Sequence, residues 1–204
     1  MRRNSIAALA AIALLATGTQ FARADDNATS DQYPRRLFAE KFLPQGKSYA
    51  CFVRRYDAAH MAARKLQKVT VMKLLVTAEM VPEDKALNYS FRLGLNFRDR
   101  RGNFDSSGNC GHPSAFEMSA DKMHLGCGVD CDGGGISVEL AHADNSTLIR
   151  LESIRIWQNN KPDDEGFALE GGADDRVFRL DRADLEDCRS LVADRKELAA
   201  MRHK

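Results

Sequence analysis

The side chains with the greatest capacity for chemistry lie in one short stretch, HLGCGVDCDGGG, which runs from His124 to Gly135. This stretch holds a histidine, two cysteines, two aspartates and three consecutive glycines. Imidazole nitrogens and thiolate sulfurs are ligands that zinc and copper prefer in proteins. One alternative is therefore a metal site with these ligands: His112, His124, Cys127 and Cys131.

The cysteines can also serve as disulfide partners, and this is the interpretation that we favour. Cys127 and Cys131 are separated by three residues, so the tight CxxC knuckle of a structural zinc site is missing. Disulfides are the default in an oxidising compartment. The number of cysteines is odd, so at most two bridges form and one thiol remains. The candidates are Cys51, Cys110, Cys127, Cys131 and Cys188.

The order of the cysteines suggests one pairing. If the segments that end at Cys110 and Cys127 form neighbouring strands, these two residues face each other at the separation that a disulfide requires. Cys131 is then available to Cys188 or Cys51. A bridge from Cys188 to a strand would pin a C-terminal helix against the sheet, and each bridge contributes about 2 to 4 kcal/mol.

The glycine run, Gly133, Gly134 and Gly135, predicts a turn or bulge ahead of a strand, because glycine reaches positive φ at little cost. It does not predict a phosphate cradle, since the lysine and the following helix of a P-loop are missing. It does not predict a calcium loop either, because Ala141 occupies the place of the bidentate glutamate. We expect no cofactor.

Enzyme signatures are sparse. Cys51 and His60 offer a thiol and a base, but Cys51 lies inside a predicted strand and no local motif accompanies it. The chain has no GxSxG elbow and no HExxH motif. We therefore expect a non-catalytic protein, with a hydrolase of unknown class as the second alternative after metal binding.

The first 24 residues have the pattern of a secretory signal peptide. Two arginines follow the initial methionine, residues 6–16 are apolar, and the segment ends Ala22-Arg23-Ala24. The apolar run is shorter than the roughly 20 residues that a membrane-spanning helix needs. We expect a periplasmic or secreted protein with no membrane span in the mature chain.

The predicted signal peptide affects the net charge of the chain. Its removal leaves 180 of the 204 residues and takes away three arginines, so 27 basic residues face 29 acidic ones, a net charge of −2. Bulk charge of this kind does not favour nucleic acid or an anionic membrane as a partner. The expected organisation is a signal peptide at 1–24, a flexible arm at 25–36 and a single β-rich domain at 37–204.

Strand signals dominate the domain. Residues 87–97 alternate between apolar and polar side chains, which predicts a half-buried strand. Residues 69–78 form a β-branched run that also predicts a strand. Further strands are predicted at 49–56, 103–110, 122–127, 135–140, 147–151, 154–157 and 176–180.

Two helices accompany these strands. Residues 58–66 form an alanine-rich run behind Asp57, a good N-cap residue. From Asp181 onward, apolar residues recur at helical spacing and predict a C-terminal helix. Short strands separated by turns predict a mainly β fold, an antiparallel β-barrel or sandwich with a short helix after the first strand and the C-terminal helix packed on it.

Two motifs, Arg55-Tyr-Asp-Ala-Ala-His60 and Cys131-Asp-Gly-Gly-Gly135, resemble motifs of small uncharacterised exported bacterial proteins. The resemblance covers most of the mature chain and implies compartment and architecture, with no activity attached. The expected architecture is also similar to that of lipocalin-like ligand carriers, although the Gly-x-Trp of that family's first strand is absent and Trp157 lies late in the chain.

These features together predict an exported, disulfide-stapled, non-catalytic binding or interaction protein of the bacterial envelope. Its expected partner is a small apolar ligand, held in a barrel mouth, or another envelope protein.

Overall fold

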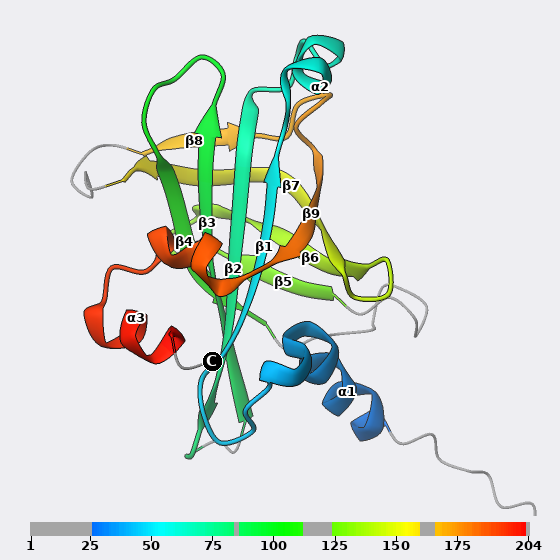
Figure 1. Ribbon diagram of the computed structural model, residues 1–204, viewed down its shortest axis with the longest axis vertical. Helices are drawn as coiled ribbons and strands as arrows, with labels where there is room; N and C mark the ends of the chain where they lie inside the picture. The colour runs from blue at the N-terminus through cyan, green and yellow to red at the C-terminus, as the bar shows by residue number, and fades with distance from the viewer. Residues whose placement is uncertain (1–25, 84–85, 112–123, 160–165, 203–204) are drawn as a thin grey trace, which may run out of the picture.

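The structure is a computed structural model that describes residues 26–83, 86–111, 124–159 and 166–202 (Figure 1). Within these residues the chain forms nine strands and five helical segments. The helical segments are α1 (Asp26–Phe38), η1 (Ala39–Lys41), α2 (Ala58–Ala63), η2 (Leu185–Leu191) and α3 (Arg195–Met201). The strands are β1 (Ser48–Arg55), β2 (Val69–Val81), β3 (Ala86–Phe97), β4 (Phe104–Cys110), β5 (His124–Gly128), β6 (Gly134–Ala141), β7 (Ser146–Gln158), β8 (Phe167–Glu170) and β9 (Val177–Ala183).

The sheet is antiparallel and closes on itself. Its strand order is β6-β5-β4-β3-β2-β1-β9-β7-β8, and β6 also pairs with β7. All strands except β8 thereby form a ring, and β8 extends from the second half of β7. The predicted mainly β, antiparallel fold is confirmed, and the closure defines a barrel rather than two stacked sheets.

Alternation along β3 builds the interior of this ring. Its odd-numbered residues from Tyr89 to Phe97 are buried in the main core, as the period of two predicts. The neighbouring strand β2 is buried on both faces, with Leu74 and Val76 in the main core and Leu75 in a second cluster outside the ring. Burial on both faces explains the continuous β-branched run of β2.

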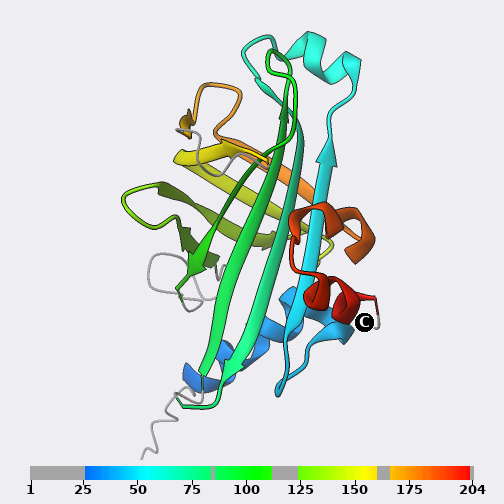
Figure 2. The same cartoon turned by 90° about the vertical axis from the view of Figure 1, so that its left-hand side faces the viewer.

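The C-terminal segment covers the outer face of β1, β2 and β3 (Figure 2). The predicted single helix is instead a 3-10 helix, η2, followed by the short helix α3, because the chain extends at Val192 and restarts at Asp194. The side chain of Asp194 caps α3 by accepting a hydrogen bond from the Glu197 amide at 2.7 Å. The outer cluster consists of Tyr49, Cys51, Val53, Leu75, Leu185, Cys188, Val192 and Met201.

The N-terminal segment closes one end of the ring. Residues 25–36 were expected to form a flexible arm, whereas α1 begins at Asp26 and buries Tyr33, Leu37 and Phe38 in the main core. The Tyr33 hydroxyl lies 3.5 Å from a carbonyl oxygen of β6, and the Phe38 ring stacks on Tyr89 of β3. The sparse apolar residues of this segment are core residues of the ring, which local periodicity does not reveal.

Two further elements differ from the sequence prediction. The strands predicted at 147–151 and 154–157 form one continuous strand, β7, which spans Ser146–Gln158. β8 was not predicted from the sequence. In the part of the chain that the structure describes, no helix has the length and apolar content to cross a membrane.

Candidate binding site

The stretch HLGCGVDCDGGG forms a stapled β-hairpin. β5 and β6 pair antiparallel, with His124 opposite Glu139. Cys127 is disulfide-bonded to Cys110, which lies directly opposite it on β4. The disulfide therefore joins β4 to the β5–β6 hairpin, in the pairing that the order of the strands suggested.

The three consecutive glycines of this hairpin, Gly133 to Gly135, lie where an added Cβ would meet neighbouring atoms. Gly134 has a φ of 70° and lies where the register of β6 against β7 shifts. A Cβ atom on Gly134 would meet the carbonyl oxygen of Ser153, and one on Gly135 would meet that of Cys127. A Cβ atom on Gly133 would meet the side chain of Val129. The glycine run thus serves a turn and a bulge and presents no ligand cradle.

The alternative of a metal site loses its central ligand in this arrangement. Cys127 in a disulfide has no thiolate to offer. Cys131 lies exposed on the turn, and His124 lies on β5. His112 falls outside the described residues. Among the residues that are described, no three His, Cys, Asp or Glu side chains are grouped to hold a metal ion.

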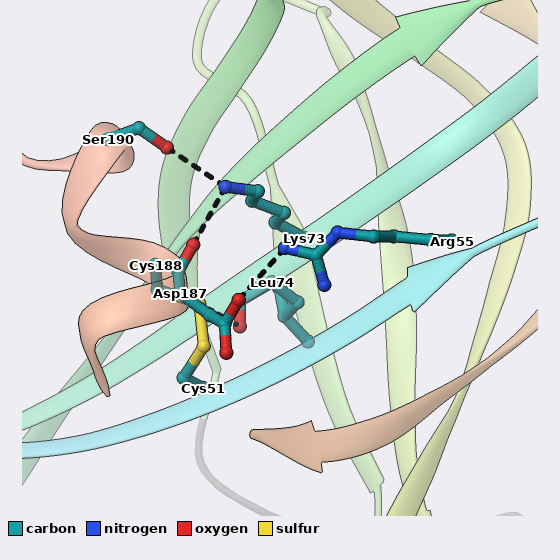
Figure 3. Close-up of a disulfide and its surroundings, with 7 residues drawn as sticks. All are labelled: Cys51, Arg55, Lys73, Leu74, Asp187, Cys188 and Ser190. Atoms are coloured by element: carbon teal, nitrogen blue, oxygen red, sulfur yellow. Dashed lines mark hydrogen bonds and ion pairs between the residues drawn. A yellow bond between two sulfur atoms is a disulfide. The ribbon is translucent and has the colours of Figure 1, made fainter. Parts of the chain in front are cut away.

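The second disulfide, Cys51–Cys188, joins β1 to η2 on the outside of the ring (Figure 3). Lys73 reinforces the contact by donating to the Asp187 carbonyl oxygen at 2.7 Å, and Arg55 forms an ion pair with the Asp187 carboxylate at 2.8 Å. Cys131 had been considered as the partner of Cys51 or Cys188. It is instead the free thiol, because those two cysteines lie together in the outer cluster.

Three connections meet at the end of the ring away from α1, at the top of Figure 1. They are residues 56–68 with α2, residues 98–103 and residues 171–176. They carry seven exposed basic residues and four acidic ones, a net charge of +3, whereas the whole chain has a net charge of +1. We call these seven residues the basic end: Arg64, Lys65, Lys68, Arg98, Arg100, Arg101 and Arg176.

Hydrogen bonds hold the three connections together. The Arg98 guanidinium donates to the carbonyl oxygens of Met61 and Lys65, at 2.6 and 3.1 Å, and so caps the C-terminus of α2. The buried Asp175 carboxylate accepts from the Lys68 amide at 2.7 Å and also from the amide of Val69. Burial raises the pKa of Asp175, and these two hydrogen bonds oppose the rise.

A hollow opens between β1 and β9 beneath α2. The β1–β9 ladder begins at Cys51 opposite Ala183 and ends at Val53 opposite Asp181. Both strands continue past that point without pairing to each other, so they diverge. We call the hollow of about 180 Å³ between them the wedge, and its walls include Arg54, Tyr56, His60, Arg64, Val177 and Arg179.

The motif RYDAAH forms one wall of the wedge. The Tyr56 ring stacks on the His60 imidazole at 4.5 Å between centroids, and burial raises the pKa of Tyr56. His60 Nε2 lies 2.8 Å from the Gln67 amide oxygen, and the Asp57 side chain caps α2. The imidazole therefore contacts an aromatic ring and an amide rather than a nucleophile. Cys51, its proposed partner in catalysis, is locked in a disulfide.

Sequence reasoning did not identify the wedge or the basic end. Arg54 and Arg179 were not singled out from the sequence. The sequence does contain a signal for the basic end. Basic residues are concentrated in three of the connections between strands, and these three connections lie at the same end of the ring. Comparison with known proteins adds no relative, because neither a family model, nor a curated protein, nor a solved structure matches the chain.

Proposed function

We propose that this chain is an exported, non-catalytic interaction protein of the bacterial envelope, and that it docks a protein partner on the basic end. The observation that carries the proposal is the composition of that end. Two of the large apolar side chains that the structure leaves exposed, Leu66 at 68% and Val177 at 45%, directly follow basic residues of that end in the chain. Exposed apolar residues within a charged rim are characteristic of protein-binding surfaces.

Export is supported by the disulfides. Four of the five cysteines are bonded in two bridges, one within the sheet and one that ties the C-terminal segment to it. Such bridges persist in oxidising compartments and are rare in the cytosol. Together with the predicted signal peptide, they favour the periplasm or the cell exterior.

A protein partner is favoured over a small apolar ligand inside the ring. Phe52, Phe91 and Phe178 are almost completely buried in the main core, together with leucine and isoleucine side chains from most strands. A ring of eight strands is just wide enough for side chains to fill it. With α1 across one end and these residues inside, the exposed surface is the better place for recognition.

Site-specific photocrosslinking in the native host tests this proposal. A photoreactive amino acid replaces Leu66 at the basic end or, as the matched control, the exposed Glu40 beside α1. We expect a discrete protein adduct from position 66 and none from position 40. The same adduct should disappear when Arg64 and Arg101 are replaced by glutamate, because the partner is held in part by charge.

Two results would contradict the proposal. One is an adduct that forms equally at both positions or survives the charge reversal. The other is a position-66 adduct with lipid or nucleic acid instead of protein.

A further inference from the structure

Two arginines that line the wedge, Arg54 and Arg179, both pair with one carboxylate beside it. Asp181 lies between two guanidinium groups, with Arg54 Nη1 at 2.9 Å from one carboxylate oxygen and Arg179 Nη2 at 3.1 Å from the other. The three side chains come from both strands that border the wedge. Arg–carboxylate pairs of this kind have directional hydrogen bonds, so the arrangement selects a carboxylate over a less directional anion.

The wedge holds more positive than negative charge. Arg54, Arg64 and Arg179 line it with Asp174, and Arg64 approaches Asp174 only to 4.0 Å. Asp181, beside the wedge, pairs with Arg54 and Arg179. One added carboxylate would balance these groups. All three guanidinium side chains are between 40% and 55% exposed, so an incoming group can reach them.

The edge of β9 adds backbone groups to this environment. The Arg182 amide donates to the Asn145 carbonyl oxygen, and the Arg176 carbonyl oxygen accepts from the Leu151 amide. The backbone N–H and C=O groups of the even-numbered residues of β9 therefore point toward β7. Alternation then turns the backbone groups of Val177 and Arg179 toward the wedge, where β1 has diverged. An extended chain entering here meets N–H and C=O groups as well as arginines.

The size of the wedge limits what it can accept. A volume of about 180 Å³ is below the roughly 300 Å³ at which small-molecule and cofactor pockets begin. It suits one or two side chains of a larger partner whose remaining surface contacts Leu66 and Val177.

We propose that the wedge binds an aspartate or glutamate side chain from an acidic segment of the protein partner, in competition with Asp181. This inference rests on the proposed function and names the chemistry of the partner. In the free protein, the Asp181 carboxylate pairs with the guanidinium groups of Arg54 and Arg179. In the complex, the partner's carboxylate replaces Asp181 in these two ion pairs. Its replacement by the neutral, isosteric asparagine should therefore strengthen binding, whereas loss of Arg179 should weaken it.

Titration of the mature, isotope-labelled protein with blocked hexaglutamate, observed by amide NMR, tests the proposal. We expect saturable shifts at residues 54–60 and 177–181, and none with hexaglutamine. Arg179→Gln should weaken binding about fivefold and Asp181→Asn should tighten it by a similar factor. Arg155→Gln, a matched charge loss on the exposed face of β7, should leave the affinity unchanged.

The opposite signs of the two wedge variants keep the test falsifiable even if one variant folds poorly. The inference is overturned if Asp181→Asn fails to tighten binding, or if hexaglutamate shifts amides elsewhere or none at all. It is also overturned if a thymidine decamer or anionic phosphatidylglycerol vesicles bind the wedge in place of the peptide. The wedge inference can fail while the crosslinking experiment still gives a protein adduct at position 66. In that case the proposed function stands, and the partner has a different chemistry.

Discussion

Gly134 shows how strongly one residue can depend on its backbone conformation. It combines a positive φ with a position where an added Cβ would overlap the Ser153 carbonyl group of β7. The nearby residues Cys131 and Asp132 also have positive φ, at 58° each, but they lie on the exposed turn where a side chain has room. Of these three positions, Gly134 is the one where conformation and space both exclude a side chain.

Gly134→Ala should lower the free energy of unfolding by about 2 to 3 kcal/mol, because the new Cβ is strained by the φ angle and displaces β7. Urea unfolding of the mature protein, followed by circular dichroism, measures this change. Gly126→Ala is the matched control in the same hairpin, since a Cβ there meets nothing within 4 Å. Its effect should stay below about 0.5 kcal/mol, and equal losses in both variants would contradict the assignment.

Among the elements, the C-terminal segment depends most on contacts with other parts of the chain. η2 and α3 are short, and short helices are not stable alone in water. The segment is held by the Cys51–Cys188 disulfide and by Glu197, which accepts two hydrogen bonds from Arg92 and forms an ion pair with Lys47 at 2.9 Å. The Glu197 side chain is only 11% exposed, so these contacts are poorly screened by solvent.

The stability contributed by Glu197 should depend on pH. Burial alone would raise the pKa of Glu197, but the hydrogen bonds from Arg92 and Lys47 outweigh it and hold the pKa below its usual 4.5. The native state therefore binds this proton less readily than the unfolded state, and the contribution is complete above pH 4.5 and lost as the pH falls through the lowered value.

Glu197→Gln should consequently cost about 1 to 2 kcal/mol at neutral pH, and this difference should shrink on acidification toward about pH 3. Urea unfolding of both proteins across that range measures it. Glu186→Gln is the control, because Glu186 pairs with Arg189 while its side chain is 73% exposed. A Glu197→Gln difference that grows in acid would show that the sign is wrong.

At the scale of the whole molecule, the two ends of the ring differ: α1 covers one end, and three connections rich in basic residues form the other. Arg182 secures the closed end by donating to the carbonyl oxygens of Leu37 at 2.8 Å and Asp144 at 2.8 Å, while its guanidinium lies over the Phe52 ring. It thus ties α1, the β6–β7 turn and β9 together. The seven residues of the basic end and the wedge lie at the opposite end of the ring.

Arg182→Gln should loosen α1 without dissolving the sheet. We expect a loss of about 2 to 3 kcal/mol of stability, since a partly buried donor with several acceptors is removed. Amide hydrogen exchange should speed up in α1 while β2 and β3 stay protected. Arg179→Gln, on the same strand but facing outward, should leave exchange in α1 unchanged. Uniform loss of protection over the sheet would contradict this role for Arg182.

Local patterns in the sequence determined the mainly β fold, the strand at β3, the N-cap at Asp57 and the capacity for two disulfides. Each of these follows from residues close together in the chain, where alternation or spacing carries the signal. Residues 26–36 belong to the helix α1, and the predicted C-terminal helix is present as the two short segments η2 and α3, because both regions take their detailed structure from distant partners.

Only the tertiary structure decided which cysteines pair and where the basic end and the wedge form. Cys51 and Cys188 are 137 residues apart, and Lys68 and Asp175 are 107 apart. No local period encodes such contacts, because they form only when the ring closes and brings the ends of alternate strands together. The divergence of β1 from β9, which creates the wedge, is likewise a property of the closed sheet and leaves no signature in either strand alone.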